Sequence, residues 1–206
     1  MDTRDLLAIP NWVTWRTERG TKVPYSVSGK RAKSNDPSTW ASYDEACRVS
    51  PQVGFVLPLD GSLTVLDLDN AIQDGCVIRR YRKLLSLVDW AEVSPSGKGI
   101  HVLIAGSKPA GLRSRFDFPE SRMEVYDRGR YITYTGDMLP GMSGEIVNGD
   151  NVFIELLHHQ ASTGKPSRGS RSYKVSAPKE PTHVRWERNK RLRAFHAELR
   201  ERLKEF

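Results

Sequence analysis

The chain has few cysteines, no long apolar run and no apparent leader, and each absence excludes a class of protein. Its 206 residues include only two cysteines, too few for a disulfide framework or a four-cysteine zinc site. No run of about eighteen apolar residues occurs, so a membrane span is not expected. The first residues lack the basic-then-apolar order of a signal peptide. We therefore expect an intracellular, soluble protein with no membrane partner.

The positive charge of the chain is unevenly distributed. The net charge is +7, but residues 161–206 contain 13 basic and 5 acidic residues, a net charge of +8. Residues 1–160 contain 19 basic and 20 acidic residues, a net charge of −1. The excess therefore lies in the last quarter of the sequence, and bulk charge does not identify what the first 160 residues bind.

The composition divides the chain into three parts. Residues 1–160 have the aromatic and apolar content of a folded domain. Residues 161–182 are rich in Ser, Gly, Pro, Lys and Arg, which predicts a flexible basic linker. Over residues 183–206, Leu192, Phe195 and Leu199 recur at steps of three or four, which predicts a basic amphipathic helix.

Residues 1–160 mix helical and strand patterns. Helices are expected over 43–49, 76–87 and 151–159, the first of them capped by Ser42 with Glu45 at the capping-box spacing. Strands are expected over 12–15, 53–57, 63–68, 91–94, 100–105, 123–127 and 130–135. Most of them are predicted to pair as hairpins, with turns at residues 58–61 and at Arg128-Gly129. The predicted fold class is α+β with a largely antiparallel sheet.

An Asp-x-Asp motif ends the strand expected over residues 63–68. Side chains alternate along a strand, so Asp67 and Asp69 share one face while Leu66 and Leu68 lie on the other. Two such carboxylates repel each other, and they stay ionised at low cost only if cations bind between them. Oxygen ligands of this kind suit Mg²⁺ or Mn²⁺. The alternative is that the motif only ends the strand and caps the next turn, because short motifs are common by accident.

A glycine-rich segment follows, with the sequence Ser94-Pro95-Ser96-Gly97-Lys98-Gly99-Ile100-His101. Glycines let backbone N–H groups approach an anion, and Lys98 and His101 can add donors to phosphate oxygens. The spacing of a Walker A loop is absent. The alternative is an ordinary hairpin in which His101 starts a strand.

A third segment places a carboxylate in a β-prone stretch. Glu124 would complete a three-carboxylate cluster if its strand lies beside the Asp pair, and Arg130 can bind a polyphosphate bidentately. The alternative is a salt bridge between Glu124 and either Arg128 or Arg130 across a hairpin.

Together and in this order, these segments resemble the catalytic domain of the archaeo-eukaryotic primase superfamily, specifically the primase-polymerases of phages and plasmids. That family has an Asp-x-Asp motif, a Ser-x-Ser-Gly-x-Gly-x-His segment, and a Glu-x-Tyr stretch followed by Arg-x-x-Thr-x-Thr-Gly. The corresponding residues are Asp67 and Asp69, Ser94 to His101, Glu124 and Tyr126, and Arg130 to Gly136. Three N-terminal segments also match the usual beginning of that family: Trp12–Trp15, Lys22–Tyr25 and Asp36–Trp40. The resemblance therefore covers roughly residues 10–160.

The resemblance implies a fold and a site. The fold would be an RRM-like antiparallel sheet packed with a smaller N-terminal αβ lobe, in a catalytic domain of residues 1–160. Asp67, Asp69 and Glu124 would hold two divalent cations, Mg²⁺ or Mn²⁺. His101 would contact the phosphates of the incoming nucleotide. The nucleotide-binding residues would be Ser96, Lys98, His101 and Arg130.

The implied activity is that of a DNA-dependent primase-polymerase, a nucleotidyltransferase that makes and extends primers by two-metal chemistry. Its partners would be a single-stranded DNA template and NTP or dNTP, with a replicative helicase as a further candidate. It would act in the cytoplasm of a prokaryotic host, encoded by a phage or mobile element. The alternatives are a polymerase of this superfamily that only extends primers, a non-catalytic replication-initiation module that binds DNA, and a metal-dependent nuclease.

A basic run lies on the helix expected after the Asp pair. Arg79, Arg80 and Arg82 are candidates for contact with template phosphates, and Tyr81 for stacking on a base. The alternative is a solvated helix face, because a run of charges is a weak motif.

Overall fold

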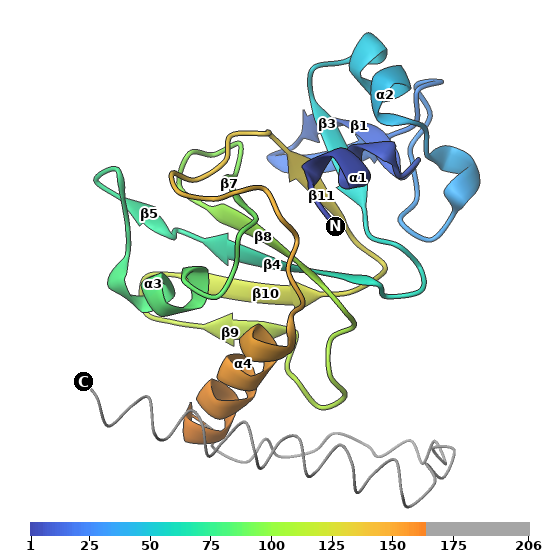
Figure 1. Cartoon of the computed structure of the whole chain (residues 1–206). Helices are drawn as coiled ribbons and strands as arrows, with labels where there is room; N and C mark the ends of the chain where they lie inside the picture. The colour runs from blue at the N-terminus through green and yellow to red at the C-terminus, as the bar shows by residue number, and fades with distance from the viewer. Residues whose placement is uncertain (164–206) are drawn as a thin grey trace, which may run out of the picture. The chain divides into compact units, whose positions relative to one another are not determined.

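Two larger antiparallel sheets, a two-stranded ribbon and four α-helices make up the computed structural model, which describes residues 1–163 (Figure 1). The helices are α1 (Thr3–Ala8), α2 (Tyr43–Val49), α3 (Arg79–Leu85) and α4 (Asp150–Thr163), with a 3-10 helix at Pro37–Thr39. The strands are β1 (Trp12–Glu18), β2 (Thr21–Tyr25), β3 (Val53–Val56), β4 (Leu63–Asp69), β5 (Ile72–Gln73), β6 (Cys76–Val77), β7 (Ala91–Val93), β8 (Ile100–Ala105), β9 (Arg115–Asp117), β10 (Arg122–Tyr126) and β11 (Tyr131–Tyr134). The described residues therefore have the predicted mixture of helices and antiparallel sheet.

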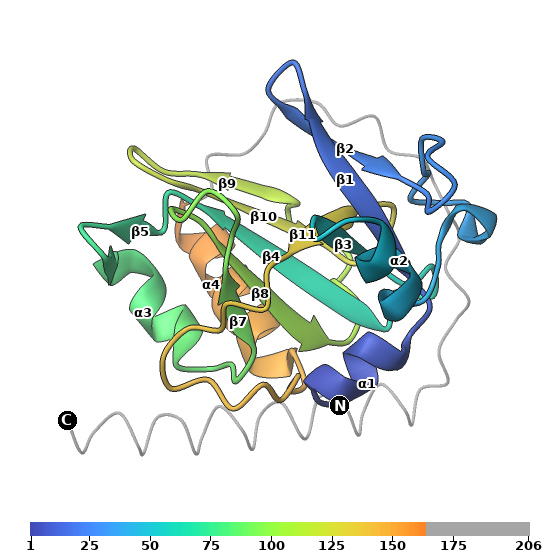
Figure 2. The same cartoon turned by 90° about the horizontal axis from the view of Figure 1, so that it is seen from above.

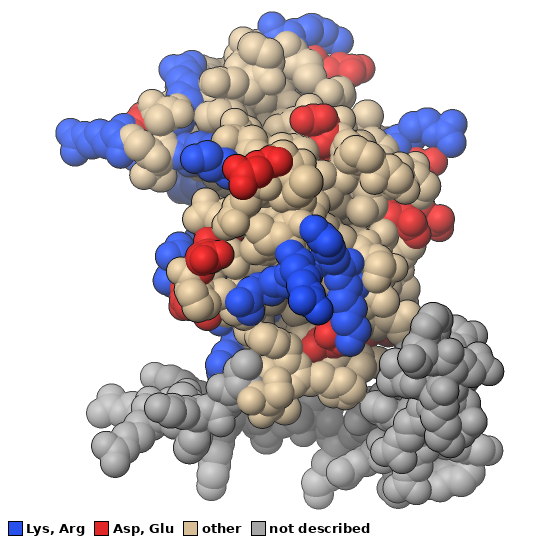
Figure 3. Space-filling model, turned by 90° about the vertical axis from the view of Figure 1, so that its left-hand side faces the viewer, with Lys and Arg blue, Asp and Glu red and all other residues tan. Residues whose placement is uncertain are grey.

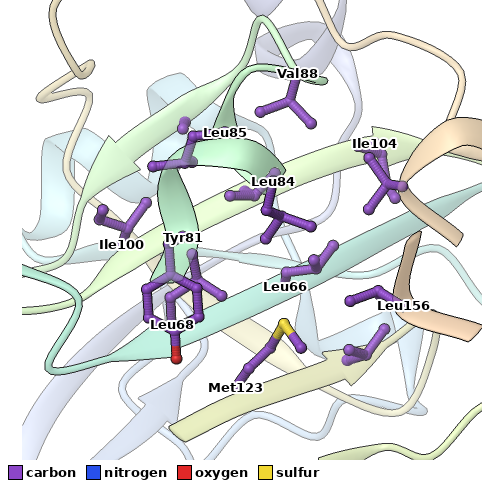
Figure 4. Packing of buried hydrophobic residues seen from close by; sticks show 14 of the residues in the cluster. Leu66, Leu68, Tyr81, Leu84, Leu85, Val88, Ile100, Ile104, Met123 and Leu156 are labelled. Atoms are coloured by element: carbon purple, nitrogen blue, oxygen red, sulfur yellow. The ribbon is translucent and has the colours of Figure 1, made fainter. Parts of the chain in front are cut away.

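The five-stranded sheet has the order β7-β8-β4-β10-β9, so β4 is its central strand. Helices α3 and α4 cover one face of this sheet. Leu66 and Leu68 of β4 pack there with Tyr81 and Leu84 of α3 and Leu156 of α4 (Figure 4). Because side chains alternate along β4, its odd-numbered residues, among them both aspartates of the motif, face the other side.

The four-stranded sheet has the order β11-β3-β1-β2 and forms the N-terminal lobe with α1 and α2. Its core contains Trp12 and Phe55, which are fully buried together with Leu63, Val65 and Leu103 of the five-stranded sheet. The lobe therefore covers one half of the face that α3 and α4 leave open. Figure 2 shows α3 and α4 on the side of the molecule away from β1 and β2.

Helix α2 has the bounds and the cap that the sequence predicts. The Ser42 hydroxyl accepts the N–H of Glu45 at 3.3 Å, and the Glu45 carboxylate accepts the N–H of Ser42 at 3.0 Å. These reciprocal bonds satisfy two donors that a helix start would otherwise leave without partners.

The predicted hairpins of residues 53–68 and 123–135 are wrong. Strand β3 belongs to the four-stranded sheet and β4 to the five-stranded one, so the turn between them connects two sheets. Strand β10 pairs with β4, whereas β11 pairs with β3, with Tyr131 opposite Val56. A turn signal identifies where the chain bends, but it does not determine which strand becomes the hydrogen-bonding partner.

Two predicted helix boundaries also differ. Residues 76–77 form strand β6 of the ribbon, and α3 begins at Arg79, because a turn at Gly75, with φ of +72°, pairs β6 with β5. Helix α4 continues through Thr163, so the first three residues of the predicted linker are helical. The rest of that linker and the predicted helix over 183–206 lie outside the described residues.

Candidate active site

Four polar residues on four neighbouring strands form a row across the five-stranded sheet. Glu92 of β7 pairs with His101 of β8, His101 pairs with Asp67 of β4, and Asp67 pairs with Glu124 of β10. Residues paired in this way point to the same face, with their Cβ atoms about 4.5–5.5 Å apart. The sheet thus brings together three of the side chains that the motifs predicted, from segments far apart in the sequence. We call these four residues the polar row.

Asp67 lies at the centre of the polar row. Its side chain is 39% exposed, and its Oδ1 lies 3.9 Å from Nε2 of His101, whose side chain is only 5% exposed. Burial raises the pKa of Asp67, and the charges of Asp69 and Glu124 raise it further, while His101 and Lys22 lower it. The negative charge of Asp67 is therefore unfavourable as the site stands, and a bound cation would relieve it.

Asp69 shares the face of Asp67 and is more exposed. Its Oδ2 lies 3.9 Å from Nη1 of Arg122, the residue opposite it on β10, and Arg122 also donates to Asp117 at 3.3 Å. The sequence interpretation did not select Arg122. Its position two residues before Glu124 on a strand was the available signal, since such residues share a face.

Glu124 is linked to Arg130 through a tyrosine. The Tyr126 hydroxyl donates to Glu124 Oε2 at 3.1 Å, and the Arg130 guanidinium lies 4.5 Å from the centre of the Tyr126 ring. Arg128 instead pairs with Asp127. Among the ion pairs of residues 1–163, none joins Glu124 to Arg128 or Arg130, so the salt-bridge alternative does not describe this structure.

The glycine-rich segment forms the tight turn between β7 and β8. The N–H of Ser94 donates to the carbonyl of Gly99 at 2.9 Å, and a Cβ at Gly99 would lie 2.8 Å from the Ser94 hydroxyl, so a larger residue would crowd this turn. Ser96 and Lys98 are exposed on this turn. The turn lies at the Asp69 end of β4, because the Lys98 carbonyl accepts the N–H of Ile72 in the segment that follows β4.

Two further residues of the site escaped the sequence interpretation. Glu92 is fully buried, and its Oε1 lies 3.0 Å from Nδ1 of His101. Its signal was a lone glutamate between Ala91 and Val93 in a short apolar stretch. Lys22 of β2 contributes positive charge near Asp67 from the N-terminal lobe, and only the packing of the two sheets identifies it.

The carboxylates match Mg²⁺ or Mn²⁺ in ligand chemistry. Asp67, Asp69 and Glu124 offer oxygen atoms only, from one face of one sheet, which is the ligand type that these cations prefer. Within residues 1–163, however, no three His, Cys, Asp or Glu side chains are close enough together to form a complete metal site. The agreement is therefore one of ligand type alone.

The basic residues of α3 lie on the opposite side of the sheet from the polar row. Arg79, Arg80, Arg82 and Lys83 are exposed, and Figure 3 shows basic side chains gathered on the side where α3 lies. Tyr81 is only 2% exposed and its hydroxyl donates to Ser121 at 3.1 Å. The prediction that Tyr81 stacks on a base is therefore wrong for this structure, because its ring is part of the core.

A pocket lies beside the second aspartate of the motif. A hollow of about 460 Å³ lies beside Asp69 and is lined by Phe118 and Arg122 among others. The guanidinium of Arg80 lies 4.1 Å from the centre of the Phe118 ring. Arg80 of α3 therefore contacts a residue of the pocket wall, which also contains the acidic Asp117 and Glu120.

Comparison with known proteins identifies the class of the chain. No model of a protein family matches it. The chain is 37% identical over 162 residues to the DNA primase-polymerase of Nitratiruptor phage NrS-1. The resemblance to phage primase-polymerases is therefore confirmed, and the chain is of the primase-polymerase type.

The match covers most of this chain but a small part of the relative. It covers 74% of this chain but 23% of the phage protein, so the chain spans about a quarter of the length of that relative.

Within residues 1–163, no helix has the length and apolar character that a membrane span requires.

Proposed function

We propose that this chain is the catalytic part of a DNA-dependent primase-polymerase that adds nucleotides to primers on single-stranded DNA. The observation that carries the proposal is the register of His101, Asp67 and Glu124 on three adjacent strands. The named activity of the phage relative supports it. A module that only bound DNA would have no evident reason to collect carboxylates on an accessible face, because they repel phosphates and one another.

In this proposal the carboxylates hold two divalent cations. Asp67, Asp69 and Glu124 would hold Mg²⁺ or Mn²⁺, which would lower the pKa of the primer 3′-hydroxyl and neutralise the triphosphate. The chain's own residues position the nucleotide. His101 contacts its phosphates, and Tyr126 holds Glu124 in place through the bond from its hydroxyl.

The remaining nucleotide contacts come from two sides of the polar row. Ser96 and Lys98 approach from the glycine-rich turn at the Asp69 end of β4. Arg130 approaches from the other end, where its stacking on Tyr126 keeps the guanidinium beside Glu124. Exposed donors on both sides suit a ligand with several phosphates.

We also propose that the five-stranded sheet is RRM-like. In chain order β4, α3, β7, β8 and β10 supply strand, helix, strand, strand and strand, and the sheet order β7-β8-β4-β10 places the first strand in the middle. This order supports the assignment because an RRM sheet also has its first strand between its third and fourth. The N-terminal lobe then serves as the smaller αβ part.

The template is proposed to contact Arg79, Arg80 and Arg82. The stacking of Arg80 on Phe118, which lines the pocket beside Asp69, supports a DNA strand that passes from the polar row around this edge of the sheet. The other proposed partners are NTP or dNTP and a replicative helicase, in the cytoplasm of the host of a phage or mobile element.

The test is nucleotide addition by the full chain on single-stranded DNA. The wild type is expected to extend a primer with labelled NTP or dNTP in Mg²⁺ or Mn²⁺, and the Asp67→Asn/Asp69→Asn double variant is expected to lose this activity. A Glu145→Gln variant, altered at an exposed carboxylate on another part of the chain, should behave as the wild type.

Three further reactions separate the alternatives. Products on an unprimed template would indicate priming, and products only on a primed one would indicate a polymerase that extends. Cleavage of labelled single-stranded DNA in Mn²⁺ without nucleotides would indicate a nuclease. Undiminished extension by the folded double variant would contradict the proposal.

A further inference from the structure

Glu92 is a fully buried carboxylate whose hydrogen-bond partners are three residues from two segments of the chain. Its Oε2 accepts the backbone N–H groups of Thr135 at 3.0 Å and Gly136 at 2.9 Å, and the Thr135 hydroxyl lies 3.1 Å from the same oxygen. Its Oε1 lies 3.0 Å from Nδ1 of His101. A buried charge is costly unless hydrogen bonds compensate it. Here Oε2 accepts the bonds from Thr135 and Gly136, and Oε1 pairs with His101.

The partners determine which nitrogen of His101 carries a proton. A carboxylate only accepts hydrogen bonds, so Nδ1 of His101 must donate to Glu92 Oε1. The ring is then held with Nε2 toward Asp67, 3.9 Å from its Oδ1. The tautomer follows here from the hydrogen-bond network, as it does when a carboxylate orients a metal-bound histidine.

We propose that Glu92 is the positioning residue for His101 and that the Thr135-Gly136 segment anchors Glu92 for this purpose. Glu92 acts through the imidazole and does not touch the nucleotide. Its effect on nucleotide binding rests on the proposed function, because that effect requires His101 to meet the phosphates. Its effect on the ring of His101 does not depend on any activity.

This role also explains the residue types of the anchor. Gly136 has a φ of +70°, a conformation that glycine adopts without strain. Consecutive N–H groups at Thr135 and Gly136 can therefore converge on one oxygen, as in backbone nests that bind anions. The Thr-Gly pair that ends the third motif thus binds a carboxylate of the protein itself.

The direct test is the protonation of His101 Nδ1, observed by ¹⁵N NMR on the full chain. In the wild type, Nδ1 is expected to carry a proton. In Glu92→Gln, the amide oxygen keeps the two backbone donors and the amide NH₂ faces the ring, so Nδ1 must accept and is expected to lack its proton. An unprotonated Nδ1 in the wild type overturns the proposal, even if the variant fails to fold. So does an unchanged Nδ1 in the folded variant.

Kinetics give a second readout. Glu92→Gln is expected to lower kcat/KM for the nucleotide about 10- to 100-fold, as loss of such supporting partners does elsewhere. The loss should fall mainly on KM, because a misplaced ring weakens phosphate binding. The matched variant Glu145→Gln should leave both parameters unchanged. A loss confined to thermal stability, with normal KM at a permissive temperature, would show that Glu92 is only structural.

The two readouts separate this proposal from the proposed function. If the wild type adds no nucleotides but Nδ1 is protonated and responds to Glu92→Gln, the activity is wrong and the positioning role stands. If the wild type adds nucleotides but Nδ1 does not respond to Glu92→Gln, the activity stands and the positioning role is wrong.

Discussion

Strand β4 presents Leu63 and Val65, and then Asp67 and Asp69, on the same face of the sheet, but the two pairs have opposite surroundings. The leucine and the valine are fully buried under the N-terminal lobe. The aspartates, two and four residues beyond Val65, lie where the lobe ends and are partly accessible to solvent. The part of β4 that carries Leu63 and Val65 therefore packs against the N-terminal lobe, and we call this part of the sheet face the covered half. The part that carries Asp67 and Asp69 is an acidic site, and we call it the open half.

Tyr126 marks the boundary between the covered half and the open half. It pairs with Val65, its ring packs against the apolar cluster of the N-terminal lobe, and its hydroxyl donates to Glu124. The lobe therefore does more than bury apolar area, because its edge sets where the site begins. The covered half supplies the packed backbone on which the polar row depends.

The largest effect on stability is expected from the covered half. Leu103→Ala deletes a fully buried side chain on the same strand as His101, and the free energy of unfolding should fall by about 2–5 kcal/mol. Asp67→Asn in the open half should leave the melting temperature unchanged or raise it, because it removes a charge that burial and its carboxylate neighbours disfavour. Thermal and urea unfolding of both variants measure the contrast. A larger loss for Asp67→Asn than for Leu103→Ala would contradict it.

A smaller effect, on DNA affinity, is expected from the side of the sheet opposite the polar row. Replacing Arg79, Arg80 and Arg82 together with Gln should reduce the dependence of single-stranded DNA affinity on salt, lowering the slope of log K against log salt by about 2. A titration by fluorescence anisotropy at several salt concentrations measures this slope. The matched triple variant at Arg4, Arg48 and Arg113, which are also exposed, should retain the wild-type slope. Equal losses in both triple variants would show that α3 is not a template contact.

The smallest effect is expected at the helix cap of the N-terminal lobe. The hydroxyl and N–H of Ser42 hold the pKa of Glu45 below its ordinary value of 4.5. A lowered folded-state pKa means that the ionised carboxylate stabilises the fold above the ordinary value, and that this contribution is lost as the pH falls through the lowered one.

Glu45→Ala should therefore lower the melting temperature slightly at neutral pH, and the difference from the wild type should shrink at acidic pH. Asp44→Ala, which removes a charge from the same turn, is the control. A difference that grows on acidification would contradict the assignment.

The sequence predicted the features of this molecule that depend on local order. The alternation of Leu66, Asp67, Leu68 and Asp69 is visible in one strand, and the Ser42 capping box is visible in four residues. The buried stripe of α3 was also visible, since Tyr81, Leu84 and Leu85 follow a helical period, but the run of charges around Tyr81 led to the prediction of a surface role instead.

The features that were missed depend on contacts between distant segments. Strand β11 pairs with β3 in the four-stranded sheet, whereas β10 just before it belongs to the five-stranded sheet, and no local pattern distinguishes this pairing from a hairpin with β10. In the sequence, Glu92 cannot be distinguished from a surface glutamate. Its burial in the short strand β7 and its hydrogen bond from Thr135 exist only in the folded chain. Lys22 approaches Asp67 for the same reason.

The central claim is that the open half of this sheet face holds cations together with a nucleotide, and counting bound Mn²⁺ tests it most directly. We expect the full chain with a non-hydrolysable nucleotide to bind about two Mn²⁺ ions in an electron paramagnetic resonance titration. The Asp67→Asn/Asp69→Asn variant is expected to bind fewer, and more weakly. Equal Mn²⁺ binding by the wild type and the folded variant would contradict the account.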